Sequence, residues 1–185
     1  MTDRPTDSLP SELPEIAQLG DPRLRRVASS VSDPGAPDVQ ALVRTLLETM
    51  TAAHGVGIAA PQISVLQRLV IVASRPTLRY PHAPQMDPTP MLNPRLLARS
   101  PDTKRGWEGC LSVPGMRGIV ARAVAIEVEY CDCTGTLQRQ ELTGFVARIF
   151  QHELDHLDGI LYVDRLASTR DLYTEREYLR QLERA

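Results

Sequence analysis

The chain has 185 residues, of which 42% are hydrophobic and 24% are charged, proportions typical of a globular domain with a packed core. Lys and Arg total 21 against 23 Asp and Glu, so the composition lacks the basic field that nucleic-acid binding requires. No stretch approaches the roughly 20 apolar residues of a membrane-spanning helix, and the first residues lack the apolar centre of a secretion signal. We therefore expect a cytoplasmic protein of one domain, with no direct nucleic-acid site and no membrane partner.

The first part of the chain is predicted to hold an arm, a helix and a strand. Residues 1–15 are polar and carry prolines without periodicity, which predicts a mobile N-terminal arm. From Asp38 to His54 apolar residues recur at helical spacing, and this helix is predicted to be capped by Asp38 and ended by Gly55. Residues 66–72 are rich in apolar and β-branched side chains, which predict a strand.

The next predicted elements are a long connection and two paired strands. The prolines of residues 76–94 predict an irregular connection. Residues 119–130 predict one strand, within which Val124, Ile126, Val128 and Tyr130 alternate with Ala125, Glu127 and Glu129. A turn at Gly135 then leads to a partner strand over residues 137–142.

Two helices are predicted to complete the chain. Thr143 and Gly144 are expected to open the first. One face of this helix carries four residues at spacings of four, three and four: Phe145, Ile149, His152 and His156. Residues 168–184 carry a partly apolar stripe and predict a last helix. The sum is an α+β fold, with antiparallel strands grouped around a central helix in a domain at residues 16–167, followed by a C-terminal helix at 168–185.

The central helix contains the pattern H-E-x-x-H within the segment QHELDHLDG, as His152, Glu153 and His156. Two histidines four apart on a helix point the same way, so both imidazoles can reach one metal ion at about 2.0–2.1 Å. Glu153, beside the first ligand, can take a proton from a water at the metal. Histidines that merely pack or cap the helix are the alternative, because the pattern is short.

A catalytic metal site of this kind needs a third protein ligand and one open position. Cys110 lies in EGCLSVPG, a loop punctuated by glycine and proline that could bring a thiolate to the helix. Packing as a small buried side chain is the alternative for an isolated cysteine. Cys131 and Cys133 compete as ligands, but they lie beside a turn at the end of a strand, which favours packing. Three cysteines in a chain without a recognisable secretion signal also favour reduced thiols.

Three segments taken together resemble a known family. GVGIAAPQ at 55–62, EGCLSVPG at 108–115 and QHELDHLDG at 151–159 are similar, in order and spacing, to the signature segments of peptide deformylases. The similarity runs from about Leu19 to Leu166. It implies a metal-dependent hydrolase that removes the formyl group from the N-terminal formyl-methionine of newly synthesised polypeptides and releases formate. N-formylmethionyl nascent peptides would be its substrates, and the ribosome is a candidate partner.

The resemblance also implies the roles of the residues that bind the metal. One divalent ion would be held by Cys110, His152 and His156, the set that spacing favours. The ion expected in the cell is Fe²⁺, which Zn²⁺, Ni²⁺ or Co²⁺ can replace. Glu153 would move the proton during the reaction.

An oxyanion site and substrate contacts follow from the same resemblance. Gln62 and the backbone N–H of Leu111 would stabilise the oxygen of the attacked formyl group, since donors fixed in a dry site meet charge as it develops. The expected substrate contacts are Gly55, Gly57, Ile58, Val113, Arg117, Phe145 and Ile149. The alternatives are a plain turn at the two glycines and a solvated strand-edge arginine at position 117.

Three further side chains have open roles. Arg148 stands just before the histidine motif, in a stretch that is wholly apolar in many bacterial deformylases, which leaves the shape of the methionine pocket open. Trp107 either covers the entrance of the site or belongs to the core. Asp155 either supports the metal ligands or lies on a solvated helix face.

An ordinary endopeptidase with the H-E-x-x-H pattern is the main competing function. Its third ligand would usually be a glutamate or histidine further along the chain, and no histidine follows His156. Glu175 and Glu177 are distant and lie in the predicted last helix. A scaffold that only binds peptides is a third hypothesis, which the presence of every residue that the chemistry requires disfavours.

Overall fold

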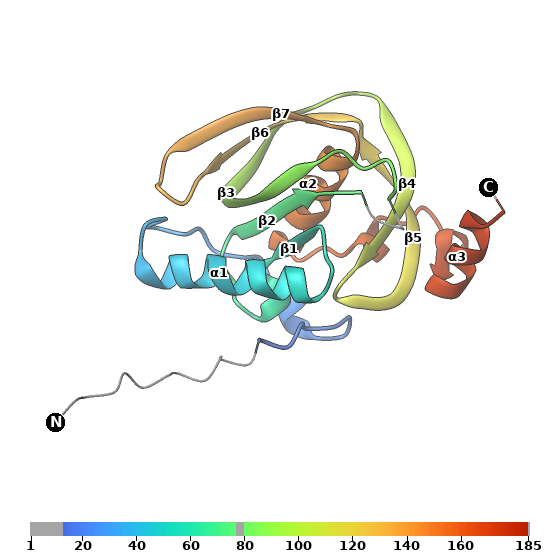
Figure 1. Cartoon of the computed structure of the whole chain (residues 1–185), viewed down its shortest axis with the longest axis horizontal. Helices are drawn as coiled ribbons and strands as arrows, with labels where there is room; N and C mark the ends of the chain where they lie inside the picture. The colour runs from blue at the N-terminus through green and yellow to red at the C-terminus, as the bar shows by residue number, and fades with distance from the viewer. Residues whose placement is uncertain (1–12, 77–79, 185) are drawn as a thin grey trace.

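The computed structural model describes residues 13–76 and 80–184. Within these residues three α-helices and two antiparallel sheets form one α+β unit, which confirms the predicted class (Figure 1). The five-stranded sheet has, in order across it, β1 (Gly57–Ala59), β2 (Leu69–Ser74), β3 (Met86–Arg99), β6 (Ala125–Cys131) and β7 (Leu137–Thr143). The three-stranded sheet contains β4 (Thr103–Cys110), β5 (Val113–Ala123) and β8 (Leu172–Thr174). The helices are α1 (Pro37–Ala52), α2 (Gly144–Leu157) and α3 (Glu175–Leu182), with short 3₁₀ helices η1 (Pro22–Arg25), η2 (Ala60–Ile63), η3 (Tyr162–Arg165) and η4 (Thr169–Asp171).

The five-stranded sheet is covered on both faces, which is why β2 is buried at every position. Successive residues of a strand point to opposite faces. Leu69 and Ile71 therefore pack with the apolar stripe of α1, while Val70 and Val72 pack with that of α2. Figure 1 shows α2 enclosed among the strands and α1 on the outside of the fold. The predicted central helix is confirmed.

β3 corrects the prediction of an irregular connection over residues 76–94, because the strand runs through the last prolines of that segment. A proline lacks the N–H that a ladder needs and is tolerated where pairing is irregular. The ladder between β3 and β6 shifts register between Leu92 and Arg95, around Pro94. Asn93, at the same shift, has a φ of 51°. The prolines thus mark an irregular strand rather than the absence of one.

Residues 119–130 belong to two strands rather than to one. β5 ends at Ala123 and β6 begins at Ala125, in different sheets. Val124 lies at the switch, where its N–H donates to the carbonyl oxygen of Asp102 at 3.1 Å. Neither glycine nor proline occurs between Ile119 and Tyr130, so no residue type in the segment indicated the break. The predicted partner strand is confirmed as β7, which pairs with β6 along its whole length.

The segment around Cys110 is a hairpin rather than a loop. β4 ends at Cys110, and β5 begins at Val113 after a turn at Leu111 and Ser112. The sequence of β4, TKRGWEGC, has charged residues and two glycines in place of apolar alternation, so no strand was predicted there. The β4–β5 pairing, rather than loop flexibility, therefore sets the position of the thiol.

α1 begins one residue before its predicted start, and Asp38 does not cap it. Ala36 is the N-cap, without a side-chain hydrogen bond, and Pro37 occupies the first helical position, for which its fixed φ is suited. Asp38 lies in the first turn, where its charge still stabilises the helix dipole. At the other end the N–H of Gly55 donates to the carbonyl oxygen of Met50 at 2.9 Å, which closes the helix near the predicted residue.

The last predicted helix, residues 168–184, is instead a series of three short elements. η4 and β8 precede α3, which is eight residues long. β8 pairs with β5, and the ring of Tyr178 in α3 lies 4.9 Å from that of Trp107 in β4. The C-terminal segment is thereby joined to the three-stranded sheet, and Figure 1 shows α3 beside β5 at the edge of the fold. The predicted arm, residues 1–15, lies mostly outside the described residues.

Tyr178→Ala is expected to lower the free energy of unfolding by about 3–5 kcal/mol, the usual cost of removing a buried aromatic ring. The residue is 1% exposed, between Trp107 and the guanidinium of Arg117. Leu179→Ala, at a neighbour that is 44% exposed, is the control and should cost less than about 1 kcal/mol. Urea unfolding of both variants measures the difference, and equal losses would contradict the packing of α3 on the sheet.

Candidate active site

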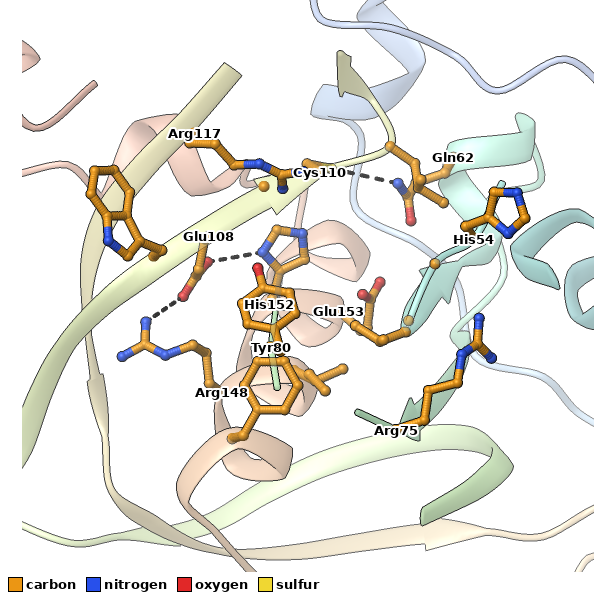
Figure 2. A pocket seen from close by; sticks show the side chains of 18 residues that line it. His54, Gln62, Arg75, Tyr80, Glu108, Cys110, Arg117, Arg148, His152 and Glu153 are labelled. Atoms are coloured by element: carbon orange, nitrogen blue, oxygen red, sulfur yellow. Dashed lines mark hydrogen bonds and ion pairs between the residues drawn. The ribbon is translucent and has the colours of Figure 1, made fainter. Parts of the chain in front are cut away.

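Three candidate metal ligands meet where the β4–β5 hairpin approaches α2 (Figure 2). Cys110 ends β4, and His152 and His156 lie on α2, which begins at Gly144 behind the N-cap Thr143 as predicted. One donor atom from each of the three side chains lies within 4.8 Å of the others. Cys110 Sγ is 3.2 Å from His156 Nε2. The structure therefore brings together the three ligands that were predicted.

The chemistry of these donors fits a divalent cation. One thiolate and two neutral imidazoles suit Zn²⁺, Fe²⁺, Ni²⁺ or Co²⁺. Burial lowers the pKa of His156, and the neighbouring His152 lowers it further, which keeps this imidazole neutral. Burial also opposes the charged form of His152, but hydrogen bonds with Cys110 and Glu108 outweigh it and raise the pKa of His152. The surroundings of His152 thus favour positive charge at the centre of the cluster.

Glu153 is buried beside the ligands with one carboxylate oxygen free. The residue is 4% exposed, and Oε2 has no hydrogen-bond partner among the described residues. Burial raises the pKa of Glu153 to about 7, which His152 partly opposes and a bound cation would lower. Gly57 makes room for it, because a Cβ there would collide with the Glu153 carboxylate. Such a carboxyl is suited to accept a proton and to return it.

Gln62 and Leu111 flank Cys110. The side-chain Oε1 of Gln62 accepts a hydrogen bond from the N–H of Ala59 at 2.9 Å. This bond fixes the amide, so that Nε2 lies 3.1 Å from Ser112 Oγ and 3.6 Å from Cys110 Sγ. Leu111 directly follows Cys110, and both it and Gln62 line the same cavity. The two predicted oxyanion residues therefore lie next to the ligand cluster.

A buried ionic network holds His152, and its centre, Glu108, had no predicted role. Glu108 Oε2 lies 2.9 Å from His152 Nδ1. Arg122 donates two hydrogen bonds to the same carboxylate at 2.9 Å, and Arg148 donates one at 2.8 Å. Burial alone would raise the pKa of Glu108, but Arg122 and His152 hold it well below its usual range. A charged carboxylate on Nδ1 orients the ring and leaves Nε2 for a metal.

Asp155 extends this network along α2. It is 7% exposed and accepts hydrogen bonds from Arg122 at 2.6 Å and from Arg165 at 2.7 Å. Of its two predicted roles, support of the ligand helix is therefore the correct one. Asp158, by contrast, is exposed and pairs with Arg68 at the surface.

Arg148 lies in the cavity wall, but its charge is fully engaged. Besides Glu108, it donates to the backbone oxygens of Lys104 and Val120. Its guanidinium lies against Gly106, where a Cβ would be 2.9 Å from Arg148 Nη2. The glycine and the arginine therefore fit together, and the charge is turned away from the space that a substrate would fill.

The ligand cluster opens into a cavity of about 440 Å³. Its wall includes five of the predicted substrate contacts: Gly55, Gly57, Arg117, Phe145 and Ile149. Trp107 is half-buried, lines the cavity and packs edge-on against Tyr173, with ring centroids 4.9 Å apart, and a role as cover of the entrance stays a prediction. Lining residues that sequence reasoning missed are His54, Val56, Arg75, Tyr80 and Gly109. Val56 and Gly109 belong to the signature segments, but His54, Arg75 and Tyr80 lie outside every motif in the sequence.

Ile58 and Val113 are not among the residues that line this cavity, and their contact with a substrate stays a prediction. The side chain of Ile58 is fully buried in the core between α1 and the sheet, because alternation along β1 turns it away from the cavity that Gly57 faces. Val113 packs instead with Val120 and Tyr162.

Comparisons with known proteins match the chain along most of its length. The family model of polypeptide deformylase matches residues 13–171. The chain belongs to the polypeptide deformylase family. Peptide deformylase 2 of Nostoc sp. is 56% identical over 167 residues, which cover 90% of this chain and 93% of the relative. Peptide deformylase 1 of Bordetella pertussis is 46% identical over 161 residues, covering 86% and 92% of the two chains.

Solved deformylase structures share the fold as well. The class I type b peptide deformylase of Acinetobacter baumannii with bound Met-Ala-Ser superposes with a TM-score of 0.81 at 43% identity, covering 83% of this chain and 98% of that one. Deformylases are metal-dependent hydrolases, and the cluster of Cys110, His152 and His156 could hold the ion. The enzyme removes the formyl group from the N-terminus of nascent peptides, which confirms the predicted activity.

Glu108→Gln is expected to weaken zinc binding by about 10–100-fold, because the amide cannot hold His152 as the carboxylate does. The change also leaves Arg122 and Arg148 without their shared counter-ion, which should lower the free energy of unfolding of the metal-free protein by about 3–5 kcal/mol. Competition with a chromophoric chelator measures the first effect, and urea unfolding the second. Glu127→Gln, at an exposed carboxylate of β6, should change neither. Unaltered zinc affinity in folded Glu108→Gln protein would show that the network does not support the ligand.

Proposed function

We propose that Cys110, His152 and His156 hold one divalent cation and that Glu153 carries the protons of formyl hydrolysis. The strongest support is the meeting of three ligand atoms within 4.8 Å beside a buried carboxylate oxygen that has no hydrogen-bond partner in the described residues. The ion is proposed to be Fe²⁺ in the cell, and Zn²⁺, Ni²⁺ or Co²⁺ suit the same donors. When bound, the cation would act as a Lewis acid that activates water and polarises the formyl carbonyl.

Glu153 is proposed to act twice in one turnover. Its free oxygen accepts a proton from the attacking water as the water oxygen adds to the formyl carbon. The same carboxyl then returns the proton to the methionine nitrogen while the C–N bond breaks, so formate and a free amine are the products. Burial raises the pKa of Glu153 and a bound cation would lower it, so the charged form that accepts the proton is favoured when the metal is bound.

Gln62 and Leu111 are proposed to stabilise the oxygen of the attacked carbonyl. The hydrogen bond from Ala59 occupies the Gln62 oxygen and thereby commits the Gln62 NH₂ group to the side of Cys110. The backbone N–H of Leu111 is proposed as the second donor. Removing one such preorganised donor typically costs about 10²–10³-fold in kcat.

The peptide is proposed to lie along the segment from Gly55 to Gly57. β1 is the edge strand of its sheet, and an edge can accept an extended peptide as a further strand. Phe145 and Ile149 would supply the apolar wall for the methionine side chain. The Acinetobacter relative binds Met-Ala-Ser, which supports a peptide in this cavity. Arg117, held at 2.8 Å by a carboxylate of α3, is proposed to contact the peptide backbone.

The assay that tests the proposed function compares two peptides. Metal-loaded protein is incubated with formyl-Met-Ala and, separately, with an unformylated internal peptide, and formate and new amines are measured. Formate from the first peptide alone is expected. Cleavage of the second would favour the endopeptidase alternative, whose candidate ligand Glu175 is paired with Arg117.

Glu153→Gln should keep its metal and lose about 10²–10⁴-fold in kcat, because an amide of similar shape cannot accept the proton of water. The measurement is formate release from formyl-Met-Ala together with the metal content of the same sample. Glu141→Gln, at an exposed residue of β7, is the matched control and should retain full activity. Wild-type turnover by fully metallated Glu153→Gln would show that Glu153 is not the general base.

The cellular location and the partners of the protein are predicted from its sequence. Among residues 13–76 and 80–184 no helix has both the length and the apolar character of a membrane span. A cytoplasmic location, contact with the ribosome, and the division of the chain into an arm, a catalytic domain and a C-terminal helix stay predictions.

A further inference from the structure

One arginine in the active-site cavity has no counter-ion among residues 13–76 and 80–184. Arg75 directly follows β2 and lines the cavity. Arg117 and Arg148 line it too, but each is paired at 2.8 Å, with Glu175 and with Glu108. Arg75 is half-buried and forms no hydrogen bond or ion pair with any other described residue. A cation in this position is a binding group for an anion from outside the chain.

The two carboxylates of the cavity wall do not neutralise this charge. Glu108 is enclosed by its own ion pairs. Glu153 is buried beside the metal ligands, and no ion pair or hydrogen bond joins it to Arg75. Figure 2 shows Arg75 on the same side of the cavity as Glu153 and His54, with Glu108 and Arg148 on the opposite side. The His54 side of the cavity therefore carries a guanidinium that pairs with no carboxylate of the described residues.

Arg75 lies beside the segment that the peptide is proposed to follow. The N–H of Ala73 in β2 donates to the carbonyl oxygen of Val56 at 2.8 Å. Arg75 lies two residues beyond Ala73 in the chain, and both Arg75 and His54 line the cavity. The formyl group has to reach Glu153, and the methionine side chain takes the apolar wall. Only the residues after methionine are left to pass this stretch on their way to solvent.

We propose that Arg75 selects substrates by favouring formyl-methionyl peptides with aspartate or glutamate at the second or third position. The inference rests on the proposed function, because it requires a peptide that lies along residues 55–57. A guanidinium presents its N–H donors in a planar fork that matches a carboxylate. An acidic side chain is therefore paired at Arg75, and a lysine or arginine in the same place is repelled.

The expected preference is modest, because this part of the cavity opens to solvent. A partly exposed ion pair changes binding by about two- to fivefold, which is the expected difference in kcat/KM between acidic and neutral peptides. The difference between acidic and basic peptides should be larger, since the two charges act in opposite directions. Both should shrink at 1 M salt, where charges are screened beyond about 3 Å.

The test measures kcat/KM for formate release from three peptides, formyl-Met-Ala-Asp, formyl-Met-Ala-Ala and formyl-Met-Ala-Lys, and from the matching set with the variable residue second. The enzymes are the wild type, Arg75→Gln, Arg75→Glu and Arg99→Glu. Arg99 is exposed on β3 and lies outside the cavity, so Arg99→Glu makes the same change in net charge as Arg75→Glu. We expect the wild type and Arg99→Glu to prefer the acidic peptides, Arg75→Gln to lose the preference and Arg75→Glu to reverse it.

Equal kcat/KM for acidic and basic peptides in the wild type at low salt would overturn the inference. A preference that persists in Arg75→Gln or Arg75→Glu would overturn it too, and Arg75→Gln decides if the charge reversal prevents folding. An equal loss for all peptides in Arg75→Gln would assign Arg75 to the peptide backbone, which also rejects selection by side chain. Absence of formate from the neutral peptide in the wild type would instead overturn the proposed function, so the two failures are distinguishable.

Discussion

The site depends on a buried network of charges around Glu108 that ties the β4–β5 hairpin to α2. Glu108 and Arg122 come from the hairpin, and Arg148, His152 and Asp155 come from the helix. Removing one partner would leave an uncompensated buried charge, at a cost of about 3–5 kcal/mol. The network thereby fixes how the thiolate on the hairpin faces the imidazoles on the helix. The relative positions of Cys110, His152 and His156 therefore depend on this buried network.

The C-terminal segment braces the same hairpin from its other side. β8 extends the three-stranded sheet, and α3 contributes Glu175 to Arg117 and Tyr178 to Trp107. Both of these hairpin residues also line the cavity. The shape of the substrate site is therefore coupled to the packing of α3, although α3 supplies none of the ligands. Substitutions in α3 are expected to act on the cavity through the hairpin.

The ligands could be predicted from sequence because their geometry is mostly local. Histidines four apart on a helix share a face whatever surrounds them, and the signature segment supplied Cys110. The role of Glu108 could not be predicted, since its partner His152 lies 44 residues away and only the folded hairpin brings them together. No sequence pattern marked Arg75 either, because what distinguishes it is the lack of a partner among the residues that the structure describes. In the fold, β3 was missed because prolines usually end strands, and the β5–β6 break was missed because no glycine or proline marks it.

The central claim is that one thiolate from the hairpin and two imidazoles from α2 hold a single cation. X-ray absorption spectroscopy of the zinc-loaded protein tests it most directly. The account predicts one sulfur at roughly 2.3 Å and two nitrogens at roughly 2.0–2.1 Å from the zinc. The sulfur should disappear in Cys110→Ser and remain in Cys133→Ser, whose thiol packs near α1. A zinc shell without sulfur, or with a sulfur that survives Cys110→Ser, would contradict the account.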